Sequence, residues 1–241
     1  MKKTYRYVSY AAGILTAFCL TASLLITSVE AVCYWLPGYF PHEYEKHQVL
    51  EDLDMEMEDL LLVTDHMMAY LRGEREELQT VADIGDKMQP FFNQRELSHM
   101  EDVRNLFLGG MALRRICLVL GAVLVLMIWR VGGLRLLPRA ICTGTGVAFG
   151  GAALLALAVS ADFRKSFTLF HHLFFDNDLW LLNPDTDRLI NIVPQGFFVD
   201  TAFWIAVVFG VSAALLLGVS LFVVLWQRGC FADSQRRGTA R

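Results

Sequence analysis

The chain has 241 residues, of which 55% are hydrophobic and 19% charged, with a formal net charge of −4. Its mean hydropathy of +0.41 is too high for an ordinary soluble domain. Residues 31–109 hold 17 acidic against 6 basic residues, so binding of nucleic acid through this region is not expected.

Four windows approach or reach the length needed to cross a membrane, because a spanning helix needs about 20 mostly apolar residues. They are residues 7–29, 111–129, 139–160 and 202–226. The first window follows basic residues, as a signal peptide does, but its apolar run is too long and a poor cleavage site follows it. We therefore expect it to be retained as a transmembrane helix.

Basic residues indicate how the spans are oriented. Lys and Arg occur in the N-terminal segment, in residues 130–138 and in residues 227–241, three segments that share one side if there are four spans. The positive-inside rule makes that side cytoplasmic. We therefore expect a mainly α, polytopic membrane protein with four transmembrane helices, N-in/C-in, and a small extracytoplasmic part containing helices and a short β-hairpin.

The first extracytoplasmic region is the acidic segment 30–110. Apolar residues recur at helical spacing over residues 50–68, and Gly73 is a suitable stop for that helix. A second helix is expected to begin near Asn93, where Glu96 follows in a capping-box-like arrangement. This helix is expected to continue into the second span.

The second extracytoplasmic region covers residues 161–201. Residues 161–175 can prolong the helix of the third span. Residues 177–192 predict two short strands around a polar turn, hence a small hairpin over the membrane face.

The five cysteines form no disulfide framework. Cys19, Cys117 and Cys142 fall in apolar spans, Cys230 lies on the expected cytoplasmic side, and Cys33 is alone outside. No spacing resembles a zinc site, a P-loop or a dinucleotide-binding turn. We expect no metal and no organic cofactor.

His99 is a candidate general base, because an imidazole titrates near neutral pH. Glu96 and Asp102 flank it at helical spacing, where a carboxylate can orient the ring and raise its basicity. The alternative is a histidine merely tied down by its neighbours. For the three other histidines of the acidic region, His42, His47 and His66, solvated or capping side chains without a function are expected.

His171 and His172 lie in a phenylalanine-rich segment beyond the third span. Partial desolvation there favours the neutral imidazole, the form that acts as a base. Adjacent helical residues point about 100° apart, so at most one of the pair faces a given site. The phenylalanines fit packing and lipid contact, and would also suit an acyl chain.

Arg114 and Arg115 lie within the first few residues of the second span, near its expected outer end. They fit either interfacial anchoring or binding of a head group or an oxyanion. No serine or cysteine nucleophile is evident beside the histidines, which suggests that the substrate supplies its own nucleophile.

Two motifs carry a family resemblance. The first is Phe91-Phe-Asn-Gln-Arg-Glu-Leu-Ser-His99-Met-Glu-Asp102-Val, and the second is Phe170-His-His-Leu-Phe-Phe-Asp-Asn177-Asp178-Leu-Trp180-Leu-Leu-Asn183-Pro. With the four-span layout, they resemble the lipoprotein intramolecular transacylase family of Gram-positive bacteria over nearly the whole chain.

The resemblance implies an O-to-N acyltransferase of the cell membrane. Its substrates are diacylated lipoproteins, in which one acyl chain moves from the glyceryl group to the α-amino group of the N-terminal cysteine, giving the lyso-form. The resemblance places catalytic histidines at His99 and at His171, with His172 left open as an alternative to His171.

The remaining implied site residues are supporting groups. The candidates for a catalytic or supporting role beside the histidines are Asp102, Glu96 and Asn177. The candidates for binding the head group or the oxyanion are Arg114 and Arg115. The site is expected at the extracytoplasmic leaflet, in contact with membrane lipid, and the sequence specifies no oligomeric state. A non-catalytic sensor or assembly factor, with its acidic ectodomain binding a partner, is the alternative. A transporter has little support, because almost no ionisable residue lies at mid-membrane.

Overall fold

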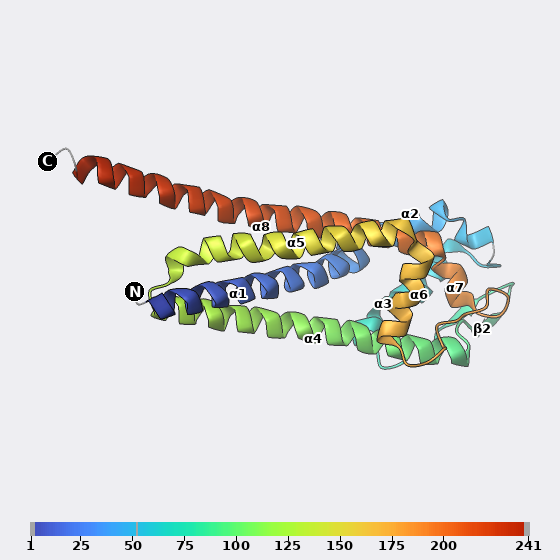
Figure 1. The fold of residues 1–241 in the computed structure, drawn as a ribbon. Coiled ribbons are helices and arrows are strands. Elements are labelled where there is room, and N and C mark those ends of the chain that lie inside the picture. The colour runs from blue at the N-terminus through green and yellow to red at the C-terminus, as the bar shows by residue number, and fades with distance from the viewer. Residues whose placement is uncertain (1–2, 52, 239–241) are drawn as a thin grey trace. The chain divides into compact units, whose positions relative to one another are not determined.

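The structure is a computed structural model that describes residues 3–51 and 53–238, with the backbone alone for 230–238. The chain divides into two compact units (Figure 1). We call residues 1–28, 113–157 and 206–241 the bundle unit, and residues 29–112 and 158–205 the histidine unit.

Within the described part of the chain, four helices are long and apolar enough to cross a membrane. They are α1 (Lys3–Glu30), α4 (Gln94–Arg130), α5 (Leu137–Ala161) and α8 (Gln195–Gly238). A short 3₁₀ turn, Leu134–Leu136, precedes α5. The predicted mainly helical class and the four membrane-crossing helices are confirmed, and α4 does run without a break from the first motif into the second span.

Small residues bring α1 and α5 close together within the bundle unit. A Cβ placed on Gly144 of α5 would lie 2.6 Å from the Ala17 Cβ and 3.1 Å from the Ile14 carbonyl oxygen. A Cβ on Gly13 of α1 would lie 2.6 Å from the Ala140 Cβ. Such close contact between backbones is the usual role of small residues where membrane helices associate.

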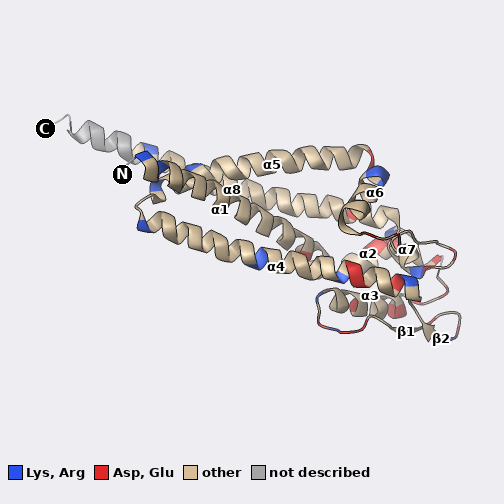
Figure 2. Cartoon of the chain, turned by 60° about the horizontal axis from the view of Figure 1, so that its bottom comes forward, with Lys and Arg blue, Asp and Glu red and all other residues tan. Residues whose placement is uncertain are grey.

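Charge is distributed unevenly over the bundle unit. Figure 2 shows that its Lys and Arg residues lie mainly at the end that carries the N-terminus. In sequence, this unit contains one acidic residue, Asp233. The pattern agrees with the N-in/C-in orientation, which stays a prediction.

The histidine unit consists of short elements and the N-terminal parts of α4 and α8. A π-helical turn, Ala31–Trp35, continues α1, and a 3₁₀ turn covers Val49–Glu51. The remaining helices are α2 (Tyr39–Lys46), α3 (Met57–Leu71), α6 (Phe163–Phe174) and α7 (Arg188–Ile192). Strands β1 (Val81–Asp83) and β2 (Met88–Pro90) pair antiparallel, with Val81 opposite Pro90.

The predicted β-hairpin exists, but not at residues 177–192. It forms at β1 and β2, where Gly85 and Asp86 adopt φ of +64° and +58°, the left-handed conformation of a tight hairpin turn. In residues 177–192, polar side chains accept the backbone N–H hydrogen bonds that strand pairing would have used. Asn183 N–H donates to Asp187 at 2.7 Å, and the chain then enters α7.

Two helix boundaries also differ from the prediction. The helix expected over residues 50–68 begins only at Met57, because the preceding segment is bound to the hairpin turn: Gly85 N–H donates to the Asp54 carbonyl at 2.7 Å. The third span is not prolonged through residue 175. Asp162 accepts a hydrogen bond from Lys165 N–H at 3.0 Å and so starts α6 as a separate helix.

Candidate active site

The structure brings His99 of α4 and His171 of α6 together within the histidine unit. Their ring centroids are 6.1 Å apart, and each residue is only 7% exposed. His172, the alternative to His171, is exposed, and its ring meets Trp180 edge to face at 5.3 Å. The geometry therefore favours His171 over His172 as the partner of His99.

A hydrogen bond fixes the orientation of the His171 ring. Its Nδ1–H donates to the Phe167 carbonyl oxygen, one helical turn earlier, at 2.8 Å. Because a carbonyl oxygen only accepts, Nδ1 carries the proton in the neutral ring and the lone pair is on Nε2. His171 is thus held in the tautomer whose Nε2 can act as a base.

Aromatic side chains enclose His171. Its centroid lies 4.3 Å from that of Phe167, 4.6 Å from that of Trp180, whose ring stacks at 29°, and 5.5 Å from that of Phe175. Burial lowers the pKa of His171, against the opposing effect of the Phe167 carbonyl, and the neighbouring His172 lowers it further. The ring is therefore mainly neutral at neutral pH.

His99 lies against the edge of Phe175, with 5.4 Å between the ring centroids. Its Nδ1 is buried and has no hydrogen-bond partner among the described residues. Buried polar atoms in native structures nearly always have a partner. An unsatisfied nitrogen beside a second histidine therefore suits a bound substrate.

The two carboxylates that flank His99 in sequence are hydrogen-bonded elsewhere. Glu96 accepts from Asn93 N–H at 2.7 Å and from Leu189 N–H at 2.6 Å. Asp102 accepts from the Asn177 Nδ2 at 2.9 Å. The predicted carboxylate–histidine pairing is absent from the described hydrogen bonds, and both acids instead join α4 to the segment after α6.

The predicted capping box at the start of α4 is confirmed. Besides the bond to the Glu96 carboxylate, the Asn93 Oδ1 accepts from Glu96 N–H at 3.0 Å. The Asn93 Nδ2 also donates to Asp187 at 2.7 Å. Burial would raise the pKa of Asp187, but the bonds that it accepts from Asn183, Asn93 and Thr186 hold it below its ordinary value.

Trp180 is the residue at this site that the sequence analysis missed. It stacks on His171, and its buried Nε1–H has no hydrogen-bond acceptor among the described residues. The sequence offered one indication of this role, because Trp180 lies in the same motif as His171. A buried, unpaired N–H beside the two imidazoles is a candidate donor to a substrate oxygen.

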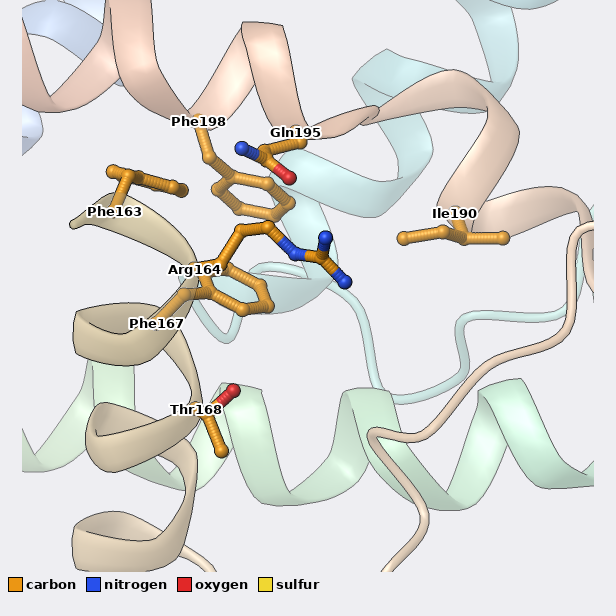
Figure 3. Close-up of a pocket in the computed structure, with 7 residues that line it drawn as sticks. All are labelled: Phe163, Arg164, Phe167, Thr168, Ile190, Gln195 and Phe198. Carbon is orange, nitrogen blue, oxygen red and sulfur yellow. The ribbon is translucent and has the colours of Figure 1, made fainter.

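A cavity of about 160 Å³ adjoins the site (Figure 3). The rings of Phe163, Phe167 and Phe198 line it together with Arg164, Thr168, Ile190 and Gln195. Phe167 and Phe198 are 5.2 Å apart between centroids. Phe167 therefore contacts both this mostly apolar space and the His171 imidazole.

Arg114 and Arg115 belong to the bundle unit. The Arg114 guanidinium donates to the Thr27 hydroxyl of α1 at 3.5 Å, and Arg115 is exposed. These contacts fit the anchoring alternative. A role in binding a head group or an oxyanion stays a prediction.

Comparison with known proteins gives one family. Residues 14–198 match the family described as lipoprotein intramolecular transacylase Lit. A protein of Aquifex aeolicus (strain VF5), described as uncharacterized, is 30% identical over 129 residues, covering 52% of this chain and 55% of that protein. This chain thus spans about half the length of that curated relative.

Solved structures share the fold. The membrane integral lipoprotein intramolecular transacylase Lit from Bacillus cereus is 18% identical with a TM-score of 0.76, covering 92% of this chain and 98% of that one. A form of the same protein with a histidine-to-arginine mutation matches with a TM-score of 0.73, covering 93% of this chain and 95% of that one. Since the family match spans well over half of the chain, the chain belongs to the lipoprotein intramolecular transacylase family Lit, a family of membrane-integral acyltransferases.

Proposed function

We propose that this chain moves an acyl chain from the glyceryl group of a diacylated lipoprotein to the α-amino group of the lipoprotein's N-terminal cysteine. The observation that carries the proposal is the pair of buried imidazoles, His99 and His171, with ring centroids 6.1 Å apart. Two bases at this spacing can serve an attacking nitrogen and a leaving oxygen that share one carbon atom.

The reaction needs no nucleophile from the protein. The amine nitrogen attacks the ester carbonyl carbon, an N–C bond forms, and the C–O bond to glycerol breaks. Burial lowers the pKa of both imidazoles, so both begin neutral. One imidazole accepts the proton that leaves nitrogen and passes it to the other, which gives it to the glycerol oxygen, so the net movement is one proton from nitrogen to oxygen. We assign the accepting role to the His171 Nε2, because Nδ1 is committed to the Phe167 carbonyl.

Trp180 is the proposed donor to the oxyanion. Attack on the ester puts negative charge on the carbonyl oxygen, and a fixed N–H in a site with little water stabilises that charge strongly. The Trp180 Nε1–H is buried and unpaired among the described residues, and stacking on His171 fixes its ring.

The cavity beside Phe167 is the proposed position for part of an acyl chain. Three phenylalanine rings and Ile190 give it an apolar lining, which suits a hydrocarbon tail. We further propose that the site faces the extracytoplasmic leaflet, where diacylated lipoprotein N-termini lie. The three basic segments in the sequence, before the first span, between the second and third and after the fourth, support this orientation.

The test is an assay of the purified full chain in detergent with a synthetic S-diacylglyceryl-cysteine lipopeptide. The product has the same mass as the substrate, so it is detected by tandem mass spectrometry and by loss of the free α-amine. We expect conversion by the unaltered chain and a loss of at least about 100-fold in each of His99→Ala and His171→Ala, since general acid–base groups contribute about 10² to 10⁴.

His172→Ala is the matched control, because His172 is the exposed neighbour of His171 and should keep most of the activity. Retained conversion in His99→Ala or His171→Ala would remove that histidine from the mechanism. A non-catalytic sensor or assembly factor would instead leave the lipopeptide unchanged even with the unaltered chain.

A further inference from the structure

A second group of ionisable side chains lies where α2 meets the first turns of α8. Glu43, His47 and Asp200 each offer a ligand atom, and these atoms lie within 4.8 Å of one another. The His47 Nε2 is 2.7 Å from the Asp200 Oδ2 and 3.4 Å from the Glu43 Oε2. None of these residues takes part in the proposed acyl transfer.

Glu43 is the member of this group whose carboxylate is incompletely paired. The residue is only 1% exposed, and its Oε2 points toward His47 without a hydrogen-bond partner among the described residues. Burial, and secondly the Asp200 carboxylate, raise the pKa of Glu43. Two carboxylates this close, one of them buried, repel each other unless a cation or a proton lies between them.

The frame around the group is rigid. The Phe197 ring of α8 stacks on Phe40 and Tyr44 of α2, with centroids 5.9 and 6.1 Å apart. The His47 ring lies directly on Gly196, where an added Cβ would come within 2.4 Å of its Cε1. Ligands held on packed helices in this way are preorganised, as a metal site requires.

We propose that Glu43, His47 and Asp200 form a binding site for a divalent transition metal ion of the zinc type. Imidazole and carboxylate are ligands for such ions, and three protein ligands leave one tetrahedral position open. An ion about 2.0 to 2.2 Å from each ligand places them about 3.3 to 3.6 Å apart. The His47–Asp200 pair, at 2.7 Å, therefore opens by about 0.6 to 0.9 Å, and the His47–Glu43 pair, at 3.4 Å, already fits.

Lys46 competes with the ion. Its Nζ donates to the Asp200 Oδ2 at 2.6 Å, the same oxygen that contacts His47, and its side chain is 46% exposed. An exposed lysine exchanges its partner at little cost, since ion pairs at the surface contribute little to stability. Removing this ammonium should therefore strengthen metal binding.

The experiment uses the full chain in detergent, freed of any purification tag and kept reduced. Zn²⁺ binding is measured by calorimetry and by elemental analysis after gel filtration. We expect one high-affinity site in the unaltered chain. The affinity of this site for Zn²⁺ should fall by more than about 10-fold in His47→Ala and in Glu43→Gln. Changing only a group that hydrogen-bonds to a metal ligand already weakens binding by about this factor, and these variants change a ligand itself. Lys46→Gln should bind more tightly.

His42→Ala is the matched control, because His42 lies on the same helix outside the group and its loss should leave binding unchanged. Bound Co²⁺ gives a second readout: we expect visible ligand-field bands without the near-ultraviolet band of a cysteine thiolate. Absence of saturable binding in the unaltered chain, equal binding in His47→Ala, or a thiolate band would each overturn the proposal. Lys46→Gln keeps the test decisive if His47→Ala fails to fold.

Discussion

At the scale of single residues, the site depends on how two imidazoles and one indole are held. His171 has one nitrogen committed to a backbone carbonyl and the other available, and Trp180 covers its face. The indole therefore has two separable effects: its ring keeps water from His171, and its N–H can donate to a substrate oxygen. Substitutions that remove one effect at a time distinguish them.

Trp180→Phe should keep the stacked ring and remove only the donor. We expect kcat for lipopeptide conversion to fall by about 100-fold, the loss typical for one oxyanion donor, while the thermal unfolding midpoint changes little. Steady-state kinetics with the tandem mass spectrometric readout measures this. An unchanged kcat would mean that the Trp180 N–H does not contact the reacting oxygen.

Trp180→Ala should in addition expose His171 and raise its pKa toward the ordinary value of about 6.5. In the unaltered chain burial lowers that pKa, so the neutral base persists as the pH falls toward 6. We therefore expect the activity of Trp180→Ala, relative to Trp180→Phe, to be lower at pH 6 than at pH 8. Comparing two variants on one substrate cancels the titration of the substrate amine.

The titration of His171 can also be observed directly by NMR of chains labelled at histidine Cε1, with His171→Gln to assign the resonance. A midpoint at or above about 6.5 in the unaltered chain would contradict the burial argument. The same depressed pKa implies that the unfolded chain takes up this proton more readily. His171 therefore lowers stability as the pH falls below about 6.5.

At the scale of the elements, one buried carboxylate holds two helix starts together. Glu96 accepts the Asn93 N–H at the beginning of α4 and the Leu189 N–H at the beginning of α7. The sequence predicted the first of these bonds, because a capping box is local. It could not predict the second, because Leu189 lies 93 residues away and approaches only in the folded chain.

Glu96→Ala should destabilise the histidine unit by about 2 kcal/mol or more, because two backbone donors lose a charged acceptor worth about 1.5 to 3 kcal/mol each. The measurement is the thermal unfolding midpoint in detergent. Glu101→Ala is the control, an exposed acid on the same helix. Equal midpoints for the two variants would show that the paired cap contributes nothing measurable.

The α1–α5 contact gives a second test at this scale. Gly144→Ala places a methyl group 2.6 Å from the Ala17 Cβ, where two helix backbones leave no room, whereas Gly150 of α5 has nothing within 4 Å. We expect a lower unfolding midpoint for Gly144→Ala and an unchanged or higher one for Gly150→Ala, since alanine favours helix. If the two variants had the same midpoint, α1 and α5 would not be in contact at Gly144.

At the scale of the whole molecule, the sequence predicted what depends on composition and short-range pattern. The four apolar helices and the continuous α4 followed from it. The position of the hairpin did not, because Asn183 and Asp187 bond to local backbone, whereas the Gly85–Asp86 turn has the tight geometry. The pairing of His99 with His171 followed from the family resemblance, and Trp180 and the group around His47 required coordinates.

Orientation in the membrane is the remaining property of the whole molecule on which the proposed function depends. Basic residues occur in three segments next to the four span ends that share one side, so both termini should be cytoplasmic. Green fluorescent protein fused after residue 241 should therefore fluoresce, and alkaline phosphatase fused there should be inactive. Phosphatase inserted at residues 184–185, in the loop before α7, should be active. The opposite pattern would place the histidines on the cytoplasmic side, away from the lipidated N-termini, and the acyl-transfer proposal would then fail even with the four spans intact.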